Sequence, residues 1–159
     1  RRMADAGGGV IFKSTLMRVL YEYGLVDGIY QQDYKSLFGA KGGKVLHNPE
    51  YEPVENVLAV IKAARGVAVF AHPSVYNSME LVAELAAAGR IDGVEIEHPR
   101  NTPEDKEELR RLAAKYGLVT TGGTDFHGIH AGKPRRLGLC RCTDEEVLRL
   151  NELAKAKKA

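Results

Sequence analysis

The chain of 159 residues has little cysteine, little net charge and no long apolar run. Its two cysteines, Cys140 and Cys142, are separated by one residue, which is too close for an unstrained disulfide and closer than in most zinc sites. We expect reduced thiols within a strand, which makes the cytoplasm the default compartment. A formal net charge of +2 argues against a dedicated nucleic-acid-binding protein, although it does not rule out a local basic pocket.

Membrane and secretion signals are also lacking. The apolar stretches are far shorter than a membrane span, and no apolar segment of the signal-peptide kind follows the first residues. The composition, 44% hydrophobic and 28% charged, is that of an ordinary globular protein. The length predicts one domain over residues 1–159, with a helical and irregular insertion at 1–52 and βα units at 53–159.

Local signals predict an alternating order of helices and strands after residue 53. Ser14 is expected to cap the first helix, which Gly24 ends, and a short helix is expected around residues 33–38. Asn77 with Glu80 is expected to form a capping box. Further helices are predicted from 53, at 77–89, at 102–117 and from 143, with strands at 67–71, 93–97 and 118–122.

Strands that alternate with helices of this length predict an α/β fold built from parallel βα units. In such folds, functional side chains gather at the carboxyl ends of the strands. His72 follows the first predicted strand, Glu97 and His98 end the second, and Asp125 and His127 follow the third. The sequence therefore predicts a functional site at this edge of the sheet.

The segment from Thr120 to Gly128 is the most informative of these strand exits. In extended backbone, Asp125 and His127 point to the same side while Phe126 points away. A carboxylate beside an imidazole is a suitable partial ligand set for a divalent metal.

Each of these residues also has an ordinary structural interpretation. His72 could be a strand-end histidine bonded to backbone, Asp125 could cap a turn, and His98 could simply begin a loop. Glu95 and Glu97 lie on the same side of one predicted strand, and one of them could face solvent.

Taken together, Phe70-Ala71-His72-Pro73, residues 93–98 and residues 122–128 resemble the polymerase-and-histidinol-phosphatase (PHP) family, most closely its small phosphoesterases that act on nucleotide phosphates. The resemblance covers about residues 13 to 138. It implies the C-terminal part of a distorted (β/α)7, TIM-like barrel that carries two or three divalent metal ions, with manganese, iron or zinc suiting the mixed ligands.

By this resemblance, His72, Asp125 and His127 are catalytic residues that ligate metal. His98 contacts the substrate phosphate, and Lys13 stands where the family has a phosphate-contacting arginine, which lysine replaces without the bidentate fork. The family begins with a His-x-His motif that does not occur here before His72. The chain therefore resembles a portion of the domain that is incomplete for catalysis.

These observations predict a metal-dependent phosphoesterase that hydrolyses phosphate esters of nucleotides or short oligonucleotides. A catalytically incomplete module that binds phosphate or a partner protein is the alternative, and a metal-dependent amidohydrolase is a weaker one. An incomplete barrel would leave strand edges unpaired, so self-association is also expected.

Overall fold

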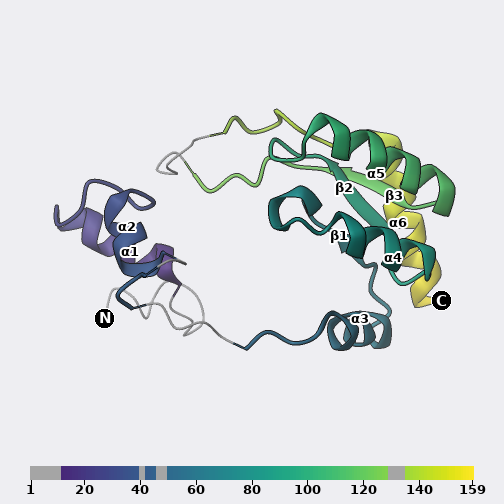
Figure 1. Ribbon diagram of the computed structural model, residues 1–159, viewed down its shortest axis with the longest axis horizontal. Coiled ribbons are helices and arrows are strands. Elements are labelled where there is room, and N and C mark those ends of the chain that lie inside the picture. Colours follow the sequence, from purple (N-terminus) through teal and green to yellow (C-terminus); the bar gives the residue numbers. More distant parts are fainter. Residues whose placement is uncertain (1–11, 40–41, 46–49, 129–134) are drawn as a thin grey trace. The chain divides into compact units, whose positions relative to one another are not determined.

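The computed structural model describes residues 12–39, 42–45, 50–128 and 135–159. They fall into two compact units, drawn in Figure 1. The first holds the described residues up to 50 together with 127 and 128, and the second holds residues 51–126 and 135–159. The prediction of one domain over residues 1–159 stays a prediction.

The described residues of the first unit form two helices, α1 (Lys13–Glu22) and α2 (Gln32–Phe38). The predicted cap at Ser14 is wrong, because α1 begins at Lys13 after an extended Phe12 and no side chain caps it. Gly24 follows the end of α1 with a φ of +67°, a left-handed conformation that glycine adopts without a steric cost.

The second unit contains a three-stranded parallel sheet in the order β1-β2-β3. The helix and strand order predicted from the sequence is confirmed, with a short 3-10 helix, η1, in addition. The elements are α3 (Val54–Ala63), β1 (Val69–Phe70), η1 (Pro73–Tyr76), α4 (Met79–Ala87), β2 (Gly93–Glu97), α5 (Pro103–Tyr116), β3 (Val119–Gly122) and α6 (Asp144–Lys158).

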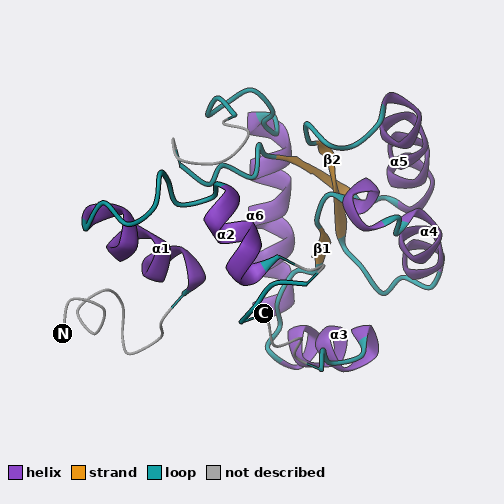
Figure 2. Cartoon of the chain, turned by 60° about the vertical axis from the view of Figure 1, so that its left-hand side comes forward, coloured by secondary structure: helices purple, strands orange, loops and turns teal. Residues whose placement is uncertain are grey.

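The sheet lies between α6 on one face and the pair α4 and α5 on the other (Figure 2). Apolar side chains from β2, α4 and α5 fill the core, and Val82, Val94 and Leu109 are fully buried there. This burial is the main stabilising contribution, since each large apolar side chain removed from water contributes about 1.5–3 kcal/mol. The core thus fixes the strands whose carboxyl ends carry the predicted site.

Helices α5 and α6 begin where the sequence predicts, each after a residue whose side chain caps the first turn. Thr102 accepts a hydrogen bond from the backbone N–H of Asp105, and Thr143 accepts one from Glu146, as N-caps do. The predicted cap at Asn77 is wrong: α4 begins at Met79 without a side-chain cap, because Asn77 instead ends η1 in a left-handed conformation.

The residues around the two cysteines differ from the prediction of a strand. Cys140 and Cys142 lie in the loop before α6, where neither belongs to a strand. Both are free, partly buried thiols. The strand prediction failed because the apolar residues on the approach to this segment, Leu137 and Leu139, are exposed rather than packed into the core.

The α/β class and the parallel βα units are confirmed, while the closed seven-stranded barrel stays a prediction. Strands β1 and β3 form the edges of the sheet that the described residues build, and the expected self-association also stays a prediction. Within residues 12–39, 42–45, 50–128 and 135–159, no helix combines the length and apolar character needed to cross a membrane.

Gly93 permits β2 and β3 to approach closely, and we expect Gly93→Ala to destabilise the fold by about 3 kcal/mol. A Cβ atom at Gly93 would lie 2.6 Å from the carbonyl oxygen of Val119, where only backbone movement could relieve the clash. Urea unfolding measures the loss. Gly89→Ala is the matched control, because its Cβ would enter open space and its φ of +62° alone should cost about 1 kcal/mol. Equal losses in the two variants would contradict the clash.

Candidate functional site

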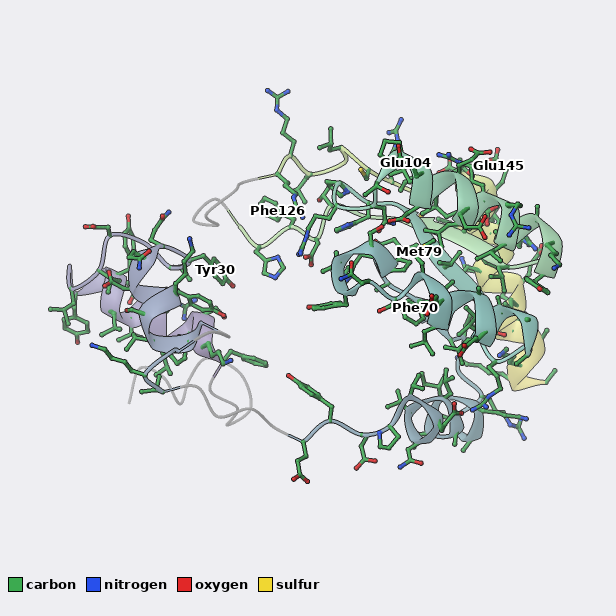
Figure 3. The ribbon with its side chains drawn as sticks, viewed as in Figure 1. Tyr30, Phe70, Met79, Glu104, Phe126 and Glu145 are labelled. Atoms are coloured by element: carbon green, nitrogen blue, oxygen red, sulfur yellow. The ribbon has the colours of Figure 1, made fainter. Side chains whose placement is uncertain are left out.

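Three of the predicted residues follow the carboxyl ends of neighbouring parallel strands. His72 lies two residues after β1, whose last residue Phe70 is labelled in Figure 3. His98 follows β2 directly, and Asp125 lies three residues after β3. The second unit therefore places these side chains at one edge of its sheet, as the parallel topology predicts.

His72 has an uncommon backbone conformation, with φ 29° and ψ 62° directly before Pro73. A positive φ is sterically unfavourable for histidine, and the residue before a proline normally adopts an extended conformation. The backbone N–H of His72 donates a 2.8 Å hydrogen bond to Oε2 of Glu95, which stabilises this conformation. The ring nitrogen Nδ1 is buried and has no hydrogen-bond partner among the described residues.

His98 is fully buried beside His72, with 5.1 Å between the two ring centroids. Its Nδ1 accepts a 3.2 Å hydrogen bond from the backbone N–H of Arg100. A neutral imidazole that accepts at Nδ1 carries its proton on Nε2. That Nε2 is buried and has no partner in the described part of the chain, so it is a donor without an acceptor.

The surroundings of His98 keep its ring neutral. Burial, together with the charges of His72, Arg135 and Arg100, lowers the pKa of His98 to about 4, while the carboxylate of Asp125 opposes this shift. Asp125 is therefore close enough to His98 to act on it electrostatically. At neutral pH the ring presents an uncharged N–H rather than an imidazolium.

The local geometry around Asp125 differs from the prediction. Asp125 has a φ of 52°, so the backbone is not extended there, and the argument that Asp125 and His127 share a side by alternation is wrong. The left-handed conformation is one that aspartate tolerates better than most residues. The guanidinium of Arg135 donates a 3.3 Å hydrogen bond to the carbonyl oxygen of Thr124, the residue before Asp125. This bond places a positive charge at the loop that carries Asp125.

Glu95 and Glu97 do not act on the same side, contrary to the simple alternation. The β2–β3 register is irregular between them, as in a β-bulge. Glu95 reaches the backbone of His72, whereas Glu97 pairs with Lys106 at 3.2 Å and Arg110 at 2.6 Å. Partial burial raises the pKa of Glu97, but the hydrogen bonds from Lys106 and Arg110 outweigh it and leave the pKa lowered.

Sequence reasoning missed the role of Glu95, which contacts both sides of the site. Besides its bond to His72, its Oε1 would lie 3.1 Å from a Cβ atom at Gly123, so glycine at that position leaves room for the carboxylate. The glycine pair 122–123 at the end of β3 was the available signal, because it indicates a close approach by another group.

The other two predicted residues belong to the first unit. The ring of His127 packs edge-on against Tyr30, with centroids 5.8 Å apart and planes at 83°. The ammonium of Lys13 lies over the ring of Phe38, 5.8 Å from its centroid. The predicted metal and phosphate roles of His127 and Lys13 stay predictions.

A divalent metal fits the chemistry of the second unit in part. The unpaired nitrogen of His72 and the carboxylate of Asp125 are the borderline and hard donors that such ions take. Among the residues that the structure describes, however, no three histidine, cysteine, aspartate or glutamate side chains are placed together to hold an ion. The described residues thus offer donors that suit a metal ion but do not form a complete ligand set.

Two curated proteins are similar to this chain. One is a phosphoribosyl 1,2-cyclic phosphate 1,2-diphosphodiesterase from Eggerthella lenta, 34% identical over 118 residues, which are 74% of this chain and 44% of that protein. The other is the 5'-3' exoribonuclease Rnm of Escherichia coli, 31% identical over 127 residues, which are 77% of this chain and 42% of that protein. The chain spans less than half the length of both relatives.

A solved structure is similar over most of the chain. It is the crystal structure of a candidate metal-dependent phosphoesterase from Bifidobacterium adolescentis, with a TM-score of 0.70 and 30% identity over 90% of this chain and 50% of that one. No family model matches the chain. The chain is therefore a member of the PHP family of phosphoesterases and corresponds to the C-terminal part of such a protein.

Proposed function

We propose that this chain is part of a divalent-metal-dependent phosphoesterase that hydrolyses phosphate esters of nucleotides or short oligonucleotides. The observation that carries the proposal is the pair of buried imidazoles at the strand ends. His72 and His98 lie 5.1 Å apart, and each has a buried ring nitrogen without a partner among the described residues. Buried polar atoms are normally satisfied, so these two nitrogens are suited to a bound group.

In this proposal His72 and Asp125 of the second unit hold metal, and the metal-ligating role of His127 stays a prediction from the family resemblance. Manganese, iron or zinc suits nitrogen and oxygen donors of this kind, and two or three ions would make a complete site. Such ions lower the pKa of bound water toward neutrality and bind phosphate oxygens. The carboxylate of Glu95 keeps His72 in its unfavourable backbone conformation through the 2.8 Å bond to its N–H.

His98 has a separate role, which is to donate from Nε2 to a phosphoryl oxygen. Because its Nδ1 already accepts from Arg100, Nε2 carries the proton and cannot at the same time offer a lone pair to a metal. A buried, neutral donor of this kind stabilises negative charge that develops on phosphate. The guanidinium of Arg135, whose charge acts on His98, supports the same charge, and the phosphate contact of Lys13 stays a prediction from the family resemblance.

A second function remains as the alternative, because a metal cluster needs more donors than the described residues bring together. If the full-length protein lacks further ligands, such as a His-x-His motif, the same imidazole pair would serve a module that binds phosphate without hydrolysis. Intact mass together with metal analysis of the purified full-length protein separates the two. Two or three bound ions support the enzyme, and a metal-free protein that binds phosphate supports the module.

A substrate screen tests the proposed reaction directly. With Mn2+, the full-length protein is expected to release nucleoside or phosphate from nucleotide phosphate esters and to lose this activity after chelation. Matched amide substrates are expected to remain intact, because the buried His98 donor and Arg135 favour an anionic group. Cleavage of amides without cleavage of phosphate esters would contradict the proposal and support an amidohydrolase.

A further inference from the structure

We propose that Asn101 is a positioning residue of this site, which shapes the end of β2 so that Glu95 can hold the backbone of His72. Asn101 lies in the turn between β2 and α5, outside the motifs at His72, at residues 93–98 and at residues 122–128. The inference rests on the proposed phosphoesterase function for its catalytic consequence. Its structural part, the linkage from Asn101 through Glu95 to His72, stands on contacts within the second unit.

Asn101 is almost completely buried, with 6% of its surface exposed, and uses its donors on the backbone around the site. Its Nδ2 donates to the carbonyl oxygens of Glu95 and Ile96, both at 3.0 Å. Its backbone N–H donates to the carbonyl oxygen of His98 at 3.2 Å. The two carbonyl oxygens need a hydrogen-bond donor, which fixes the orientation of the Asn101 amide. If the amide were flipped, Oδ1 would face these carbonyl oxygens and would have no proton to donate.

A single amide that reaches two consecutive carbonyls marks a departure from regular strand geometry. Consecutive carbonyl groups of a strand point to opposite sides, whereas those of Glu95 and Ile96 both accept from Asn101. The register irregularity between Glu95 and Glu97 falls at this point. Asn101 thus stabilises the bulge, and the bulge separates Glu95, on the side of His72, from Glu97, on the side of α5.

The side chain of Glu95 connects the bulge to His72. Its Oε2 accepts the N–H of His72, whose φ of 29° needs such a contact to persist. On its other side the carboxylate has little room, since a Cβ atom at Gly123 would come within 3.1 Å of Oε1. A shift of β2 at Asn101 would therefore move the ring of His72, although the hydrogen bonds of Asn101 described above go to backbone carbonyl oxygens and not to the imidazoles or the carboxylate proposed to bind metal or phosphate.

Asn101→Asp in the full-length protein tests the inference. The substitution keeps the shape of the side chain but places a carboxylate against two carbonyl oxygens, so the bulge should open. We expect the amide hydrogen of His72 to exchange at least about ten times faster in NMR measurements on the metal-free protein. We expect kcat with Mn2+ to fall about 100-fold while KM changes less than about threefold, because the catalytic groups are misplaced rather than removed.

Asn151→Asp is the matched control, since it makes the same change of charge at an exposed position of α6 and should alter neither quantity. Gly123→Ala is the second variant, because it displaces Glu95 from the opposite side and should reproduce both effects, even if Asn101→Asp does not fold. Unchanged exchange of the His72 amide in the folded variants would overturn the inference, with or without a change in kcat. An inactive wild-type protein would overturn the proposed function, and the exchange measurement would still decide the role of Asn101.

Discussion

Asp125→Asn in the full-length protein is expected to lower kcat/KM for phosphate esters at least about 100-fold while leaving the fold intact. The substitution removes the negative charge that a divalent metal requires and keeps the size of the side chain. Asparagine tolerates the left-handed backbone of residue 125, where φ is 52°, about as well as aspartate does. The side chain is also exposed, so the free energy of unfolding should change by less than about 0.5 kcal/mol.

Steady-state kinetics with Mn2+ and thermal unfolding on the same preparation measure both parts of this expectation. Asp27→Asn is the control, because it makes the same chemical change at an exposed position of the first unit, outside the proposed site. Turnover close to that of the wild type in the Asp125 variant would remove this carboxylate from the mechanism.

Acid should destabilise the second unit through His98. The pKa of His98 is lowered from 6.5 to about 4 in the folded protein, mainly by burial. Between these two pH values the unfolded chain binds a proton that the folded protein does not, so stability is complete above about pH 6.5 and falls as the pH drops. A difference of about 2.5 pKa units corresponds to about 3 kcal/mol, of which about 2 kcal/mol should be lost by pH 5.

Urea unfolding of the metal-free protein between about pH 7.5 and 5 measures this loss, with His98→Gln as the variant that lacks it. Other groups titrate alike in both proteins, so the difference between the two pH profiles isolates His98. His127→Gln is the histidine control, because His127 is exposed and its substitution should leave the profile of the wild type. Identical profiles for the wild type and the His98 variant would show that the buried ring does not resist protonation.

Much of the fold follows from local signals that the sequence displays directly. The caps at Thr102 and Thr143 depend only on a hydroxyl and an N–H three residues later, and both helices begin where the sequence predicts them. The caps predicted at Ser14 and Asn77 are wrong, because the local pattern alone does not decide where these two helices begin. At Asn77 a 3-10 helix after His72 takes the residue that local pattern assigns to the start of α4, and no short-range signal indicates that helix.

The candidate site was predictable to the extent that it depends on topology. Parallel strands bring their carboxyl ends together, so His72, His98 and Asp125 could be placed at one edge without coordinates. The separate functions of Glu95 and Glu97 could not, because strict alternation assigns both to one side. The bulge that separates them depends on Asn101, whose contact with β2 forms only in the folded turn.

Anomalous diffraction at the manganese edge, from crystals of the full-length protein soaked with Mn2+ and inorganic phosphate, tests the central claim most directly. We predict an ion at about 2.0–2.2 Å from a ring nitrogen of His72 and an oxygen of Asp125, with a phosphate oxygen within hydrogen-bond reach of Nε2 of His98. Manganese bound away from His72 and Asp125, with His98 still unpaired, would contradict the account.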